Sequence, residues 1–152
     1  MQLPEYVTAQ EVRRVCTAMG LSDWSKKTDP SVSEKEAAVI LEIVNTQSMA
    51  IPLEEFRKGL EVELEHGVRF DDANVTNNHP VLTGKIVLAH LKETMDYYLR
   101  IDVAEIEGDL LKAILSNRMA KISDKYNKLI AAQQSLNAFV AAQLKAGVQR
   151  DS

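Results

Sequence analysis

The sequence has one cysteine, Cys16, and few of the residues that interrupt helices. A single cysteine excludes an internal disulfide framework and any zinc or iron–sulfur site that needs several thiolates. With only 4 prolines and 6 glycines in 152 residues, helices can run for long distances without a break. The first residues also lack the basic region and the apolar run of a signal peptide, so we expect no secretion by that route.

What is present indicates an ordinary folded protein. Apolar residues make up 45% of the chain and charged residues 26%, a composition that excludes a wholly disordered protein. The net charge of −4 is not typical of a surface that coats nucleic acid, so we expect no direct nucleic-acid partner. No apolar stretch is long enough to span a bilayer, and we expect no membrane contact.

The first two thirds of the chain carry signals for four short helices. A serine or threonine that precedes a glutamate by three residues forms a capping box, and such boxes begin at Thr8 and at Ser33. Pro52 predicts the start of a third helix, because proline is tolerated in a first helical turn, and Gly67 predicts its end. Apolar residues at helical spacing predict a fourth helix over residues 82–93.

The sequence therefore predicts an all-α protein, with a helical domain over residues 1–96 and a long helix over residues 97–152. No proline interrupts residues 97–146, whose apolar side chains follow a heptad rhythm with one stutter. About 50 helical residues would extend about 75 Å, whereas a compact globule of this length is about 38 Å across. The helix must therefore either fold back near Ser116 and Asn117 or protrude and pack against other subunits.

We favour packing against other subunits because residues 129–144 contain no charged side chain. A solvated helix rarely lacks charge over four turns, so this stretch is expected to be buried in a helical assembly. We predict a homo-oligomer held by the apolar side chains of this segment, with a hairpin inside one subunit as the alternative. The predicted interface residues are Leu129, Leu136, Phe139, Val140 and Leu144.

All three histidines lie in one window of 25 residues, and two of them pair with glutamates at three-residue spacing. The pairs are Glu63 with His66 and His90 with Glu93, and on a helix this spacing places both side chains on one face. The four residues could hold a divalent metal, zinc or iron, or each pair could be an intrahelical hydrogen bond with no cofactor bound. We expect no cofactor and keep the metal site as the alternative.

No catalytic constellation is legible in the sequence. The segment Thr83-Gly84-Lys85 resembles the end of a phosphate-binding P-loop, but His79 stands where the first glycine of that motif belongs. Cys16 lies on an apolar stripe, which favours a place in the core over a role as a nucleophile. We therefore assign no catalytic residue and expect a protein without enzymatic activity.

Five short elements within residues 53–101 occur in an order that resembles a known pattern. They are ELEHG at 63–67, NVTN at 74–77, TGKI at 83–86, HL at 90–91 and DYY at 96–98. Together they resemble a small domain of unknown function that occurs in bacteria and in tailed phages, sometimes attached to other phage proteins. The chain departs from that pattern at Asn78 and His79, where the pattern has acidic residues, and at Met95, where it has a proline.

The resemblance implies a helical unit with a loop rich in Asn and Thr, and it implies no known reaction. We expect the polar side chains of this loop to bind backbone groups and to cap the next helix, so that the loop acts as a clamp. Gly84 is expected to let another backbone approach its helix closely, such as that of the long C-terminal helix. The predicted clamp residues are Asn74, Thr76, Asn77, Thr83, Gly84 and Lys85.

These observations favour a structural or interaction protein, a component of a phage virion or of its assembly. The interpretation rests on the phage side of the resemblance, on the uncharged heptad segment and on the lack of a catalytic constellation. We expect the chain to associate with itself and with other virion or assembly proteins, in a virion or in the cytoplasm of a bacterial host. The alternative is a metal-binding helical protein or a metal-dependent enzyme that uses Glu63, His66, His90 and Glu93.

Overall fold

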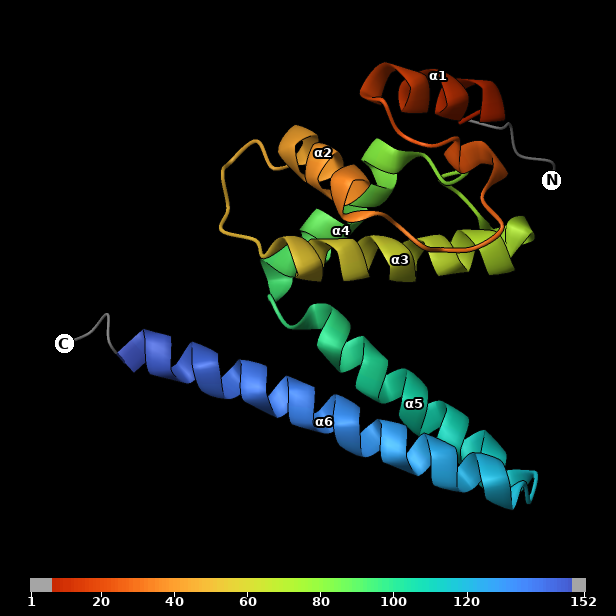
Figure 1. The fold of residues 1–152 in the computed structure, drawn as a ribbon, viewed down its shortest axis with the longest axis vertical. Helices are drawn as coiled ribbons and strands as arrows, with labels where there is room; N and C mark the ends of the chain where they lie inside the picture. Colours follow the sequence, from red (N-terminus) through yellow and green to blue (C-terminus); the bar gives the residue numbers. More distant parts are fainter. Residues whose placement is uncertain (1–6, 149–152) are drawn as a thin grey trace. The chain divides into compact units, whose positions relative to one another are not determined.

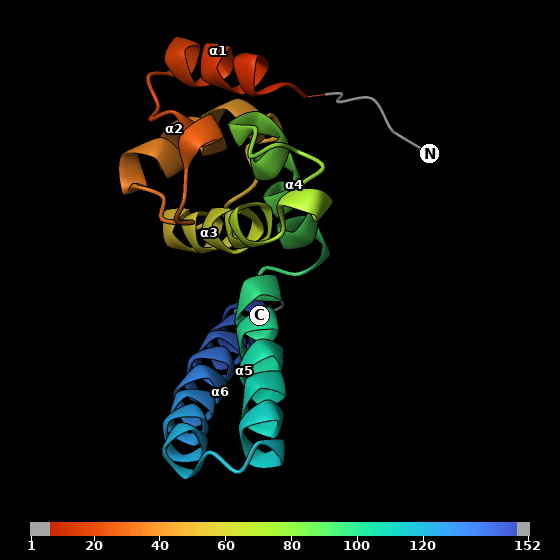
Figure 2. The same ribbon diagram turned by 90° about the vertical axis from the view of Figure 1, so that its right-hand side faces the viewer.

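The computed structural model describes residues 7–148 of the chain (Figure 1). The chain divides into two compact units, residues 1–95 and residues 96–152. The first unit contains α1 (Ala9–Met19), η1 (Trp24–Lys26), α2 (Glu34–Val44), α3 (Leu53–Arg69), η2 (Asp71–Ala73) and α4 (Pro80–Glu93), of which η1 and η2 are short 3-10 helices. The second unit contains α5 (Tyr97–Leu115) and α6 (Met119–Val148), which lie side by side in two views (Figure 2).

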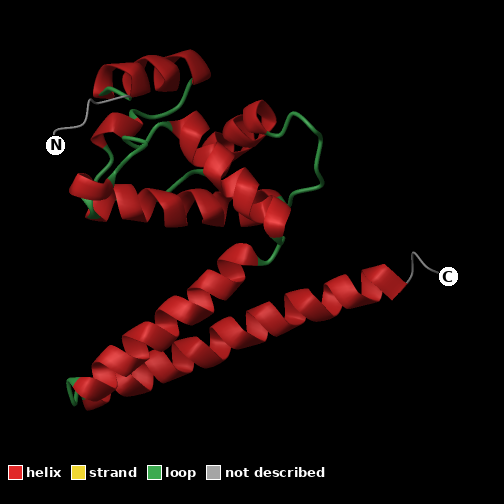
Figure 3. Ribbon diagram, turned by 180° about the vertical axis from the view of Figure 1, so that it is seen from behind, coloured by secondary structure: helices red, strands yellow, loops and turns green. Residues whose placement is uncertain are grey.

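The predicted all-α class is confirmed. Residues 7–148 form helices joined by loops and turns, with no strand among them (Figure 3). The long C-terminal helix of the prediction is α6, which has 30 residues. Neither α6 nor any other helix in the described part of the chain is long and apolar enough to cross a membrane.

The first two helices begin where their capping boxes predict. The Thr8 hydroxyl accepts a hydrogen bond from the Glu11 backbone N–H at 3.1 Å. Before α2, the Ser33 hydroxyl and the Glu36 carboxylate each accept a hydrogen bond from the other residue's backbone N–H. α1 ends at Gly20, whose φ of 67° lies in the left-handed region where glycine meets no steric penalty. Local side-chain chemistry therefore sets both starts and the first end.

α2, α3 and α4 pack against one another and enclose the core of the first unit. Its fully buried side chains include Val12, Trp24, Ile40, Phe56, Leu60, Leu64, Val87 and Leu91. Gly84 lies where α4 meets α2, because a Cβ atom at this position would stand 2.5 Å from Ile40 Cγ2. The atoms nearest this position are side-chain atoms of Ile40, Val44 and Phe56, so Gly84 makes room for side chains and not for the backbone that was expected there.

Glu36 ties the segment before α2 to that helix. Its Oε1 accepts hydrogen bonds from the Ser22 backbone N–H at 3.1 Å and from Trp24 Nε1 at 3.2 Å. Its Oε2 accepts a hydrogen bond from the Ser33 hydroxyl at 2.9 Å. Burial by itself raises the pKa of Glu36, but the hydrogen bonds from Ser22, Ser33 and Trp24 together outweigh burial and lower the pKa from 4.5 to about 2. The ionised carboxylate is therefore the form that the fold stabilises.

α5 and α6 form an antiparallel hairpin. α5 ends in a Schellman turn, in which the Asn117 N–H donates to the Ile114 carbonyl at 3.0 Å and the Arg118 N–H donates to the Ala113 carbonyl at 3.1 Å. Asn117 has the left-handed φ that this turn requires, 51°. One continuous helix over residues 97–146 is therefore not formed. The chain instead folds back beside Ser116 and Asn117, close to the stutter in the heptad pattern.

Several apolar residues of the heptad pattern pack between the two helices of this hairpin. Ala113 of α5 and Ala132 of α6 are buried where the two helices meet. Leu129 and Leu136 stand three residues before and four residues after Ala132, so they lie on the same side of α6 and are half-buried against α5 of the same chain. Of the remaining predicted interface residues, Phe139 and Val140 are half-buried and Leu144 is exposed.

We expect Glu36→Gln to lower the free energy of unfolding by about 2 kcal/mol at pH 7, because the ionised carboxylate accepts several hydrogen bonds. A depressed pKa stabilises the fold above the unfolded value, so the deficit of the variant should shrink as the pH falls from about 5 to about 2. Urea denaturation followed by fluorescence of Trp24, the one tryptophan, measures both effects.

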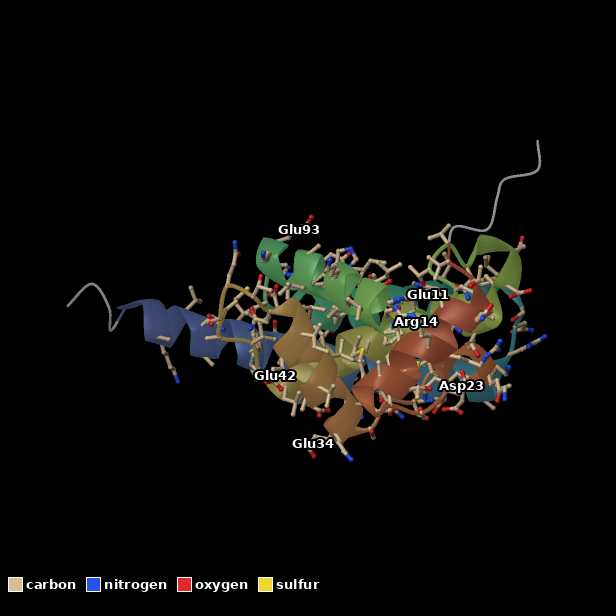
Figure 4. The ribbon with its side chains drawn as sticks, turned by 90° about the horizontal axis from the view of Figure 1, so that it is seen from above. Glu11, Arg14, Asp23, Glu34, Glu42 and Glu93 are labelled. Carbon is tan, nitrogen blue, oxygen red and sulfur yellow. The ribbon has the colours of Figure 1, made fainter. Side chains whose placement is uncertain are left out.

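The matched control is Glu42→Gln, since Glu42 is exposed on the same helix (Figure 4). It should change the free energy of unfolding by less than about 0.5 kcal/mol. A deficit for Glu36→Gln that is the same at acid and neutral pH would contradict the role given to the carboxylate charge.

Candidate functional site

Asn74 holds the loop between α3 and α4. Its Nδ2 donates to the Gly67 carbonyl at 3.1 Å and to Asn78 Oδ1 at 3.0 Å, and the Thr76 hydroxyl donates to Asn74 Oδ1 at 3.5 Å. A Cβ atom at Gly67 would overlap the Asn78 side-chain oxygen. The predicted end of the third helix at Gly67 is therefore wrong. α3 continues to Arg69, and the glycine makes room for the loop instead.

The loop also places two consecutive residues in the left-handed region, Asn77 with a φ of 48° and Asn78 with a φ of 57°. Asparagine is favoured there because its short side chain forms local hydrogen bonds. Asn77 Nδ2 donates to the Val7 carbonyl at 3.0 Å, and His79 Nδ1 accepts from the Leu82 N–H at 3.4 Å to cap α4. Burial lowers the pKa of His79, which favours the neutral ring that can accept this hydrogen bond.

A cavity of about 170 Å³ lies between α3, this loop and α4. Its polar lining comes from Glu63, His66, Asn74, Thr76 and Thr83, and the rest of its lining comes from Gly67, Ala73, Val75 and Ile86. All of these residues except Ala73 belong to the three sequence elements ELEHG, NVTN and TGKI. Elements that are separate in the sequence therefore meet around one small space, which is the candidate binding site of the first unit.

The remaining predicted clamp residues lie on α4 and differ in their surroundings. Thr83 is only 2% exposed as a residue, and it lines the cavity, from which its hydroxyl oxygen is reachable because no side-chain N or O atom among residues 7–148 is both fully buried and without a partner. Gly84 packs against α2, and Lys85 is exposed. The loop is thus held by the asparagines and Thr76, whereas Thr83 contributes a hydroxyl to the cavity wall.

The structure brings together two of the four predicted metal ligands. Glu63 on α3 and His90 on α4 face each other, with Glu63 Oε1 3.3 Å from His90 Nδ1. His66 lines the cavity with Glu63 but is exposed, and Glu93 is exposed at the end of α4 and points outward (Figure 4). Within residues 7–148, no three His, Cys, Asp or Glu side chains are placed to hold one metal ion. The spacing within each helix did not identify the pair because the pair forms between helices.

The second unit presents a different candidate surface, which we call the apolar face. It is defined by seven exposed side chains, Leu111, Ile114, Leu115, Met119, Tyr126, Ile130 and Leu144. Leu111 precedes the buried Ala113 by two residues, and Ile130 precedes the buried Ala132 by two residues. At about 100° per residue each lies about 200° around its helix from the buried alanine, so both side chains point away from the line of contact, on the outer sides of the hairpin.

Charged side chains of the hairpin pair with one another. Lys125 of α6 pairs with Asp109 of α5 at 2.6 Å, and Lys128 pairs with Asp124 within α6 at 3.0 Å. Residues 129–144, which include Ile130 and Leu144 of the apolar face, contain no charged side chain. The hairpin therefore combines ion pairs with exposed apolar side chains that no charge accompanies over residues 129–144.

Replacing Asn74 by alanine removes both hydrogen bonds that its amide nitrogen donates. We expect Asn74→Ala to lower the free energy of unfolding by about 1–2 kcal/mol. Amide hydrogen exchange should accelerate over residues 71–79 more than in the neighbouring helices. Val75→Ala is the control, because 87% of that side chain is exposed. If the loop were as well protected in the Asn74 variant as in the Val75 variant, the clamp would have to be abandoned.

Comparison with curated proteins and with solved structures gives no match for this chain. A family model described as a protein of unknown function, DUF5661, matches residues 12–107. The match extends beyond residues 53–101, includes every residue that lines the cavity, and ends before the first residue of the apolar face. Because it covers more than half of the chain, the expectation of an uncharacterised domain family is confirmed, and the chain belongs to the DUF5661 family of proteins of unknown function.

Proposed function

We propose that this chain is a non-enzymatic interaction protein that forms a homo-oligomer through its C-terminal hairpin. The observation that supports the proposal is the apolar face of α5 and α6. Of the ten large apolar side chains that are exposed among residues 7–148, seven belong to this face. Exposed apolar side chains gathered on two packed helices are more typical of a binding surface than of a monomer's solvated side.

A second copy of the same hairpin is the partner that suits this face best. A layer of two helices buries its apolar side only against another layer, and two such hairpins together make a four-helix bundle. Residues 129–144 carry no charge, so a charged partner surface would be desolvated there without compensation. An identical uncharged face avoids that cost, and a two-fold axis lets each copy contribute the same residues.

A place in a phage virion or in its assembly is part of the proposal and rests on the sequence resemblance. In that setting the partners are further copies of the chain and other virion or assembly proteins, in a virion or in the host cytoplasm. The family match is compatible with a matched domain and a self-association surface that lie in different parts of the chain. Its range ends at residue 107, so the apolar face belongs to a part of the chain outside the matched domain.

The combined substitution Tyr126→Lys and Ile130→Lys tests self-association. These side chains are 55% and 39% exposed in the single chain, so the hairpin itself should fold. In an oligomer each lysine would be buried in an apolar contact, at a cost of several kcal/mol. Light scattering should give at least twice the mass of one chain for the wild type and the mass of one chain for the variant, with helicity by circular dichroism preserved.

Ser135→Lys is the matched control, because Ser135 is exposed on α6 and helical geometry places it on the side opposite the apolar face. This variant should keep the mass of the wild type. A wild-type protein that is monomeric at micromolar concentration would refute the proposal. So would a double variant with unchanged mass, since the contact would then lie elsewhere.

Metal binding is the second candidate function, and one observation favours it. Glu63 and His90 meet at 3.3 Å, and Glu63 shares its cavity with His66. If the chain binds zinc or iron there, protein purified without chelator should contain stoichiometric metal by elemental analysis, and Glu63→Gln should remove it. Glu65→Gln on the same helix is the control, because Glu65 is exposed beside Arg69. Wild-type protein without bound metal after incubation with either ion would exclude this function.

A further inference from the structure

The cavity of the first unit supports an inference that does not depend on self-association or on a bound metal. We propose that this cavity binds the end of a small organic cation, a primary alkylammonium group. The Glu63 carboxylate and the Thr83 hydroxyl supply acceptor oxygens to the cavity, and Val75 and Ile86 supply its apolar lining. Charge, hydrogen bonding and size each support this class of ligand.

The charge of the lining favours a cation. Glu63 is the only carboxylate among the lining residues, and neither lysine nor arginine is among them. The Glu63 side chain is 17% exposed, and its neighbour His90 carries a charge only when it is protonated. Asp71 and Asp72 directly precede Ala73 of the lining and add negative charge nearby. A positive group in this partly water-excluded space is therefore attracted more strongly than it would be in open solvent.

The hydrogen-bonding groups of the cavity favour a donor. Thr83 is almost fully buried as a residue, but its hydroxyl oxygen is reachable from the cavity, because it makes no hydrogen bond within residues 7–148 and no side-chain N or O atom there is both fully buried and without a partner. The Asn74 amide is already bonded to Gly67, Asn78 and Thr76, so it shapes the wall rather than binding a ligand. An ammonium group has three N–H donors and no acceptor, which suits a carboxylate and an unpartnered hydroxyl oxygen.

The size and the apolar side of the cavity favour a short alkyl chain. A volume of about 170 Å³ corresponds to about five or six water molecules at about 30 Å³ each. n-Butylammonium, with one nitrogen and four carbons, is of that size. Val75 is 87% exposed and Ile86 is half-buried, and both line the cavity, so the lining also offers hydrocarbon contacts.

Binding can be tested with three probes of the same chain length, n-butylammonium, n-butanol and butyrate, at constant ionic strength so that screening is equal. The readout is the amide chemical shift of Gly67, Thr76 and Thr83 in the full chain. n-Butylammonium should shift these signals with a dissociation constant on the order of 1 mM, as suits so small a ligand. The neutral and anionic probes should bind at least about tenfold more weakly, because they lack the charge-assisted contact.

Two variants locate the ligand. Glu63→Gln should weaken n-butylammonium binding about tenfold, and Thr83→Val should weaken it several-fold while nearly preserving side-chain shape. Glu65→Gln is the control on the same helix and should bind like the wild type. The comparison of the three probes needs no variant, so a variant that fails to fold leaves the test intact.

Several outcomes would overturn the proposal. One is n-butanol or butyrate binding as tightly as n-butylammonium, and another is a folded Glu63→Gln protein that binds n-butylammonium unchanged. A third is zinc occupying the cavity and displacing the probe at equal concentration, which would identify a metal site. The titration repeated on the Tyr126→Lys and Ile130→Lys double variant should give the same dissociation constant, which separates this proposal from self-association.

Discussion

The contact between Gly84 of α4 and Ile40 of α2 positions the polar residues on which the first unit depends. Because a Cβ atom at Gly84 would stand 2.5 Å from Ile40 Cγ2, α4 lies at a depth that only glycine permits without displacement. Thr83 precedes Gly84 by one residue, so it is rotated by about 100° and faces the cavity instead of α2. His90 lies at nearly the same rotation, where it meets Glu63 of α3. One apolar contact thus sets both the cavity wall and the pair between α3 and α4.

The two units differ in the kind of surface that they offer to a ligand or a partner. The first unit encloses its apolar side chains and leaves a small polar space where three sequence elements meet. The second unit is a single layer of two helices, so it keeps an apolar face and covers only the line between its helices. The family match includes the cavity and stops before this face. The proposed ligand binding and the proposed self-association would therefore use different surfaces, each within its own unit.

Signals that act between a side chain and its own backbone were readable from the sequence. The helix starts at Thr8 and Ser33 and the left-handed end at Gly20 follow from groups within a few residues of one another. Signals that depend on a distant neighbour were misread or missed. Gly67 has the same local preference whether it ends a helix or makes room for Asn78, and only the packed loop distinguishes the two. The apolar repeat of α6 could be recognised in the sequence, but the sequence did not show which of its residues are exposed in the single chain.

The sequence by itself determined the all-α class, the helix starts of the first unit and the apolar stripes, since helical periodicity and capping are local properties. Tertiary structure alone decided which partner each stripe has. A heptad stripe fits a helix of the same chain as well as one of another chain, and the turn at Asn117 selected the same chain for Leu129 and Leu136. It also decided that Glu63 meets His90, because two residues 27 positions apart come together only when α3 and α4 pack.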